Sequence, residues 1–191
     1  MSFKMKDSKS EGDVKITGIN VEGNDKSIKE KIIVWAAEED FEAKIEATPK
    51  EAPIDWALRI TSKAPITVNI IVQKPRGKES QLIASLGVVV SEQHYNGLMG
   101  LKEKDRWEVV YSIIRDLTTI CPDCYVIVQP SPVNPQRLLI TKILYTDTLT
   151  KEKFLSTLRV LVNMFALLSL RLSALFGAHA GRRAKDTMGF M

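Results

Sequence analysis

The sequence is poor in the two side chains that most often build metal and redox sites. Its 191 residues include only two cysteines and two histidines. Two cysteines exclude a disulfide-rich secreted scaffold. The polar opening segment MSFKMKDSKSEGD also lacks the apolar region of a secretory signal peptide. We therefore expect a cytoplasmic protein.

Phosphate-binding and catalytic motifs are missing as well. Gly18 and Gly23 have the spacing of a P-loop, but Lys26 follows two residues too late. Gly97 and Gly100 form only a fragment of a dinucleotide-binding fingerprint. No nucleophile, base and acid can be assigned to one another. The sequence thus predicts a protein that has no cofactor or metal and is not an enzyme.

A long uninterrupted hydrophobic run is absent. The most apolar stretch, residues 160–170, lies between Arg159 and Arg171, whereas a transmembrane helix needs about 20 apolar residues. We therefore predict no membrane partner and interpret this stretch as part of a buried or interfacial helix.

The stretch belongs to the strongest helical pattern in the chain, residues 150–176. Large apolar side chains recur there at helical spacing and fall on one narrow stripe. Burying one of them contributes about 1.5–3 kcal/mol, so we expect the stripe to pack against a sheet. Its members are Phe154, Leu158, Leu161, Phe165, Leu168, Leu172 and Phe176.

A second apolar patch lies on the opposite side of the same helix and consists of Val160, Leu167 and Leu170. Either a neighbouring helix of the same domain covers it, or it is a subunit or client interface. Because the sequence offers only two other helices, we favour a homodimer contact.

The rest of the pattern predicts an α+β fold with an antiparallel sheet packed by helices. Four segments alternate between apolar and polar residues, and their short connections favour adjacent antiparallel strands. The expected order is helix, four strands, helix, two strands, helix. The segments are 27–40, 41–47, 55–62, 65–74, 80–90, 101–120, 125–129, 137–145 and 150–176, with a glycine-containing break at 94–100.

The helix expected at 101–120 has one clear apolar side in this interpretation. The side chains assigned to it are Trp107, Val110, Tyr111, Ile114 and Leu117. They recur at helical spacing, so we expect them to face the core.

The expected organisation is one domain with two tails. Residues 1–26 form a polar tail with weak alternation, compatible with an accessory strand. Residues 27–177 form a single α+β domain, and residues 178–191 form a flexible basic tail. Net charge is +4 with a pI near 9.0. The candidate anion contacts are Lys74, Arg76 and Lys78 in the loop KPRGKE, and Arg182 and Arg183 in the tail. Solubility, or charges that discourage edge pairing, explains them equally well.

Cys121 and Cys124 form a CxxC motif with several interpretations. It can be a redox pair, half of a zinc site, a local or intersubunit disulfide, or a structural pair. The motif follows a predicted helix and precedes a strand, the reverse of the thioredoxin order, and a zinc site needs two further ligands. We favour a structural role, with a disulfide as the next alternative.

The order of elements is similar to the type III secretion chaperone-like fold, especially its YbjN-like branch and similar archaeal families of unknown function. The resemblance also rests on the strand with Trp56, Leu58 and Ile60, and on LTKEKFLSTLRVLVNMFALL after TDT. It covers residues 27–176. It implies an α+β fold, usually dimeric, whose better-known members bind extended segments of other proteins without hydrolysing nucleotide. It assigns no role to an individual residue.

These observations predict a chaperone- or adaptor-like interaction protein whose client is an unknown protein. The exposed sheet face, or an open edge, would accept an extended peptide by strand addition. The alternative is binding of nucleic acid or another acidic polymer through the basic loop and tail. A redox protein that uses the two cysteines is the third hypothesis.

Overall fold

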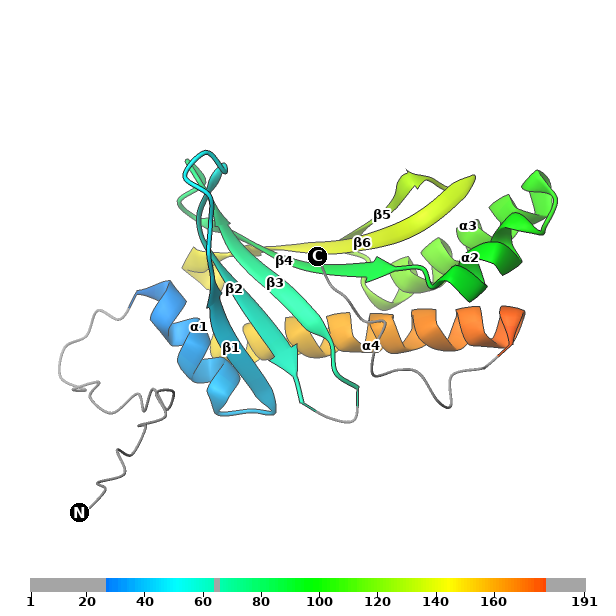
Figure 1. The fold of residues 1–191 in the computed structure, drawn as a ribbon. Coiled ribbons are helices and arrows are strands. Elements are labelled where there is room, and N and C mark those ends of the chain that lie inside the picture. The colour runs from blue at the N-terminus through cyan, green and yellow to red at the C-terminus, as the bar shows by residue number, and fades with distance from the viewer. Residues whose placement is uncertain (1–26, 64–65, 178–191) are drawn as a thin grey trace, which may run out of the picture.

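The computed structural model describes residues 27–63 and 66–177. The expected tails at 1–26 and 178–191, with Arg182 and Arg183, lie outside these residues. Figure 1 shows a strongly twisted sheet with helices packed along it. The elements are α1 (Ile28–Ala37), β1 (Phe41–Glu46), β2 (Ile54–Ser62), β3 (Asn69–Pro75), β4 (Gln81–Val89), α2 (Glu92–Met99), α3 (Glu103–Ile120), β5 (Cys124–Ser131), β6 (Asn134–Tyr145), the 3-10 turn η1 (Thr146–Thr148) and α4 (Lys151–Phe176).

The sheet has six strands in the order β1-β2-β3-β4-β6-β5. Every pair of neighbours is antiparallel. The predicted α+β class with an antiparallel sheet and helical packing is therefore confirmed. β6 adds beside β4, so β5 becomes the second edge of the sheet, opposite β1.

The core lies between one face of this sheet, here called the inner face, and the helices. Leu58, Val72 and Ala84 occupy neighbouring register positions on β2, β3 and β4 and are buried. The predicted stripe of α4 meets this layer, since six of its seven members are buried and Phe176 is half-buried. Helix α4 begins where the Thr150 hydroxyl accepts a hydrogen bond from Lys153 N, 3.2 Å away. It ends at Gly177, whose φ of 85° suits glycine.

Helix α4 is also long and apolar enough to cross a membrane when judged by length and composition alone. The same test is passed by core helices, and α4 buries its main stripe against the sheet. Packing within the domain thus accounts for the stripe, while 33% of the most apolar window of the helix is buried.

The break expected at 94–100 is wrong, because these residues form most of α2. Ser91 caps this helix and accepts a hydrogen bond from His94 N at 3.4 Å. Gly97 serves close packing instead of ending the helix. A Cβ atom at this position would lie 2.4 Å from Phe176 Cδ1, so only glycine lets α2 approach the end of α4.

The last hairpin is longer than predicted. Ser131 pairs with Asn134, so only Pro132 and Val133 form the turn. Pro130 and Pro135 lie within the strands. An edge strand tolerates a proline whose missing N–H would point to solvent, which is why Pro130 does not end β5 early.

Candidate functional site: an open edge strand beside an aromatic helix face

The two edges of the sheet differ in charge. β1 carries Glu42, Lys44 and Glu46 on the face turned away from the helices, here called the outer face. The Lys44 and Glu42 side chains lie 3.0 Å apart. Such charges discourage pairing with another strand. β5, with the sequence CYVIVQPS, has no charged residue, and among the described residues no strand covers its free side.

Apolar side chains flank β5 on the outer face. Tyr125 is 59% exposed and Ile127 is 47% exposed. Their register partners on β6 are Thr141 and Leu139, so the apolar surface continues onto the next strand. A strand that added to β5 would place every second side chain beside Tyr125 and Ile127.

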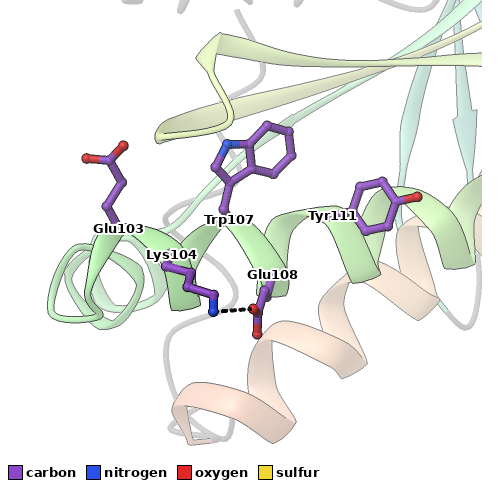
Figure 2. Close-up of a pocket in the computed structure, with 5 residues that line it drawn as sticks. All are labelled: Glu103, Lys104, Trp107, Glu108 and Tyr111. Atoms are coloured by element: carbon purple, nitrogen blue, oxygen red, sulfur yellow. Dashed lines mark ion pairs between the residues drawn. The ribbon is translucent and has the colours of Figure 1, made fainter.

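Aromatic side chains of α3 flank β5 on the inner side. Trp107 is 44% exposed and Tyr111 is 58% exposed. Their ring centroids are 6.4 Å apart in an edge-on arrangement. Figure 2 shows the Trp107 ring directed from α3 toward the β5–β6 hairpin, with the ion pair of Lys104 and Glu108 below it in this view. Trp107 and Tyr111 together are called the aromatic face below.

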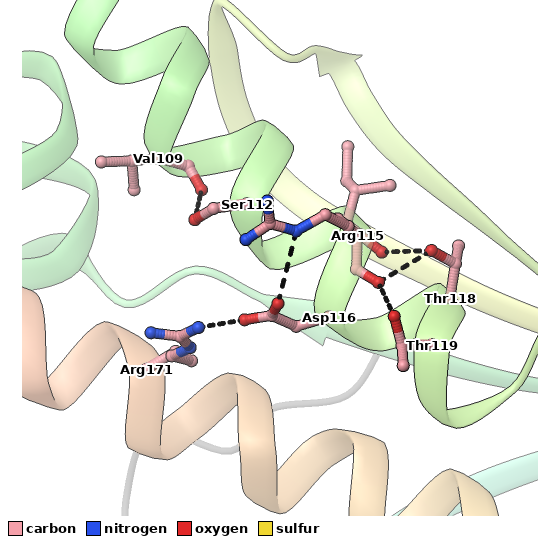
Figure 3. A network of polar contacts seen from close by, with 8 residues as sticks. Val109, Ser112, Arg115, Asp116, Thr118, Thr119 and Arg171 are labelled. Atoms are coloured by element: carbon pink, nitrogen blue, oxygen red, sulfur yellow. Dashed lines mark hydrogen bonds and ion pairs between the residues drawn. The ribbon is translucent and has the colours of Figure 1, made fainter.

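The order of the elements places the aromatic face toward the free edge. α4 contacts β4 and β6, whereas α3 contacts β5, so the step from α4 to α3 runs in the direction of the open edge. Asp116 marks the side of α3 that faces α4, because it forms an ion pair with Arg171 (Figure 3). Trp107 and Tyr111 lie about half a turn around the helix from Asp116, which directs them away from α4.

Arg106 holds the hairpin onto α3. Its guanidinium is buried and donates hydrogen bonds to Val133 O at 2.7 Å and to Leu101 O at 3.1 Å. The first bond joins α3 to the turn of the hairpin, and the second joins it to the α2–α3 connection. The edge strand and the aromatic face therefore keep a fixed relation to each other.

The apolar side expected for α3 is partly wrong. Val110 and Leu117 are buried as predicted, but Trp107 and Tyr111 are exposed, and the buried row includes Arg106 and Ile113 instead. The predicted row, which includes Trp107 and Tyr111, and the buried row, which includes Arg106 and Ile113, both have helical spacing. The sequence pattern favours the predicted row because it contains no charged residue. Arg106 enters the core because two carbonyl groups accept its hydrogen bonds.

Cys121 and Cys124 are joined by a disulfide, with Cα atoms 5.2 Å apart. Cys121 follows the last residue of α3 and Cys124 begins β5, so the bond ties the helix to the start of the edge strand. Lys142 of β6 forms an ion pair with Asp123 between the two cysteines, at 3.1 Å. Bonded sulfur atoms offer no thiolate to a metal, so this pair does not act as half of a zinc site in this state.

The candidate anion contacts of the basic loop have partners within the protein. Lys74 donates to Glu79 O. Arg76 donates to Lys50 O at 3.3 Å and lies 3.6 Å from an oxygen of Asp55. These contacts hold the β3–β4 turn against the β1–β2 connection. Lys78 is exposed in the same turn, so the loop does not present a group of three free cations.

The three residues of the apolar patch predicted on α4 differ in burial. Val160 and Leu167 are half-buried and pack against the core, whereas Leu170 is 69% exposed. Leu170 therefore remains available for a subunit contact, while the other two residues already contribute to the domain itself.

The sequence pattern did not reveal the four exposed residues of the candidate site, which are Tyr125 and Ile127 on β5 and Trp107 and Tyr111 on α3. A signal was present for two of them, because the uncharged segment CYVIVQPS contrasts with the charged segment FEAKIE. That contrast identifies the unprotected edge only when the strand order is known.

The fold and this site define a class: an α+β protein with a six-stranded antiparallel sheet and one uncharged, open edge. The chain belongs to the family described as "Uncharacterized conserved protein (DUF2299)", whose model matches residues 28–172. It is also similar to the crystal structure of an uncharacterized protein from Methanothermobacter thermautotrophicus. That similarity has a TM-score of 0.66 at 19% identity and covers 78% of this chain and 99% of the other. It shows a shared fold. No curated protein matches this chain.

Proposed function

We propose that this protein is a non-enzymatic interaction module that binds an extended segment of a partner protein by adding it as a strand to β5. The observation that carries the proposal is an uncharged edge strand with exposed apolar side chains on both flanks. Strand addition supplies main-chain hydrogen bonds for affinity, and pockets for alternate side chains supply specificity.

The geometry limits the segment that fits. Main-chain pairing is available along residues 124–129, because Pro130 has no N–H to donate. Successive side chains of an added strand point to opposite faces. One set would pack on Tyr125 and Ile127, and the other on Trp107 and Tyr111. The expected partner is therefore a segment of about six residues with apolar side chains at alternate positions or on both faces.

The resemblance to type III secretion chaperones supports the same proposal, because members of that fold bind extended protein segments. We also propose that the protein forms a homodimer through the exposed part of α4 around Leu170. Binding of nucleic acid has less support, since Lys74 and Arg76 are engaged within the domain.

Selection from a display library of random peptides about 12 residues long tests the proposal even while the client is unidentified. We expect enrichment of peptides with apolar side chains at alternate positions or on both faces of the added strand. Replacement of Tyr111 or Ile127 by Asp should weaken the selected peptides by about tenfold or more, since losing one buried apolar side chain costs about 1.5–3 kcal/mol.

Leu170→Asp is the matched control, because Leu170 is also an exposed apolar residue but lies on α4, away from β5. It should leave peptide affinity unchanged and lower the sedimentation mass if α4 forms the dimer contact. Circular dichroism should show that all three variants are folded. Selection of peptides without apolar side chains at such positions, or affinity that is insensitive to both Tyr111→Asp and Ile127→Asp, would refute the proposed function.

A further inference from the structure

The aromatic face has the chemistry of a site for a positively charged side chain. Glu103, Lys104, Trp107, Glu108 and Tyr111 line one open hollow on α3. Residues four apart share a helix face, so Glu103 lies beside Trp107 and Trp107 lies beside Tyr111. A guanidinium or ammonium group that stacks on an indole ring is attracted by its quadrupole.

One carboxylate of this hollow has no ion-pair partner among residues 27–63 and 66–177. Lys104 Nζ lies 4.0 Å from a carboxylate oxygen of Glu108 and compensates the charge of that carboxylate (Figure 2). Glu103 has no ion pair with any residue that the structure describes. A cation stacked on Trp107 would therefore meet a second favourable contact, the charge of Glu103.

The chain itself carries suitable cations in the segment that follows α4. After α4 it continues as AHAGRRAKDTMGFM, with Arg182, Arg183 and Lys185 within four positions. These residues lie outside the described part of the chain, but the point from which they start is fixed. Gln93 Nε2 donates to Gly177 O at 3.4 Å, and the Phe176 ring lies against Gly97.

The distance to be spanned is short. Gly97 and Glu103 are six residues apart in the chain, so their Cα atoms are separated by at most about 20 Å. From Gly177, an extended chain reaches about 17 Å at Arg182 and about 27 Å at Lys185. Figure 1 shows the end of α4 at the same end of the molecule as α2 and the start of α3. The extended length of the chain up to residues 182–185 is therefore of the same size as the largest possible span from Gly97 to Glu103.

We infer that the basic segment 182–185 of this chain docks on the aromatic face of α3, with one cationic side chain stacked on Trp107 and paired with Glu103. This docking stands on its own geometry. Its consequence for regulation rests on the proposed function, because a docked segment occupies one flank of β5 and competes with a client strand. A cation from a client, or from a second copy of the chain, is the competing occupant.

The indole N–H resonances of the full chain test the docking directly. The protein has three tryptophans, and Trp35 and Trp56, which are half-buried and pack against the core, serve as internal references. We expect Arg182→Glu combined with Arg183→Glu to shift the Trp107 resonance and leave the other two in place. Salt at about 0.5 M should cause the same shift, because it screens exposed charge pairs.

Lys63→Glu combined with Lys78→Glu is the matched control, since it changes the net charge equally at two exposed loop positions. It should leave the Trp107 resonance unchanged, and Glu103→Gln should reproduce part of the shift. A Trp107 resonance that is identical in wild type and the tail variant overturns the inference. A shift that disappears on dilution also overturns it, because the occupant is then another copy.

A second measurement separates this inference from the proposed function. A peptide selected on β5 should bind the Arg182→Glu, Arg183→Glu variant about two- to fivefold more tightly than wild type, the range expected for loss of one exposed cation–π contact. Equal affinity for both proteins would refute the competition while strand addition stands. Absence of any selected peptide, with the Trp107 shift present, would refute strand addition and leave the docking intact.

Discussion

Replacement of Arg106 by Met is the most informative perturbation of this fold, because it tests the contact that joins the edge hairpin to α3. Methionine keeps most of the aliphatic volume of arginine and removes the guanidinium. The variant loses the bonds to Val133 O and Leu101 O, at 2.7 and 3.1 Å. Neighbouring packing changes little.

The expected loss follows from those two bonds. A hydrogen bond from a charged donor contributes about 1.5–3 kcal/mol. Val133 and Leu101 are half-buried, so water partly replaces the guanidinium, and removal of a buried charge recovers part of its desolvation cost. We therefore expect the free energy of unfolding to fall by about 2–3 kcal/mol, less than the sum of two full bonds. For a chain of this size, the melting temperature would fall by about 4–12 °C.

Urea denaturation measures the stability, and amide hydrogen exchange locates the change. Residues of the hairpin turn around Val133 should exchange faster in Arg106→Met, while the β1–β2 pair should not. Arg115→Met is the matched control on the same helix, because the Arg115 side chain is 63% exposed and lies 3.8 Å from Asp116, and ion pairs of exposed side chains contribute little. Equal stability of the two variants, within about 0.5 kcal/mol of wild type, would refute the role given to Arg106.

Two further predictions concern the connections around the site. Gly97→Ala should lower the free energy of unfolding by about 1–2 kcal/mol, because the new methyl group meets the Phe176 ring. Gly100→Ala, with its nearest contact at 3.4 Å, should stay within about 0.5 kcal/mol of wild type. Thermal unfolding of both variants measures the difference, and equal effects would contradict the prediction. Reduction of the Cys121–Cys124 bond should lower the free energy of unfolding by about 2 kcal/mol, the chain-entropy value for so short a loop. Urea titrations with and without reductant measure the loss, and two freely alkylated thiols in the native, unreduced protein would show that the bond is absent.

The pattern in the sequence was sufficient for the class of fold. Alternation in segments such as 41–47 allows one face to be buried, and short connections make neighbouring strands antiparallel. The stripe on α4 was also predictable, because no charged residue competes with it. The break at 94–100 was not, since a glycine that ends a helix and a glycine that lets two helices meet look the same in one sequence. Only the position of Phe176 distinguishes them.

The candidate site shows the same limit more strongly. The outward direction of Trp107 depends on Arg106 finding two carbonyl groups, one of them 27 residues away. No local pattern contains that partner. In the same way, the uncharged segment 124–131 becomes an open edge only because β6 inserts beside β4.

By itself, the sequence determined what each segment is: its period, its apolar side and its charge are properties of neighbouring residues and follow from the geometry of helix and strand. The tertiary structure alone decided which strands stand at the edges, which of two possible rows of α3 is buried, and which side chains meet around β5. Those outcomes depend on contacts between residues far apart in the chain, whose free energy is set by the partner and not by the local pattern.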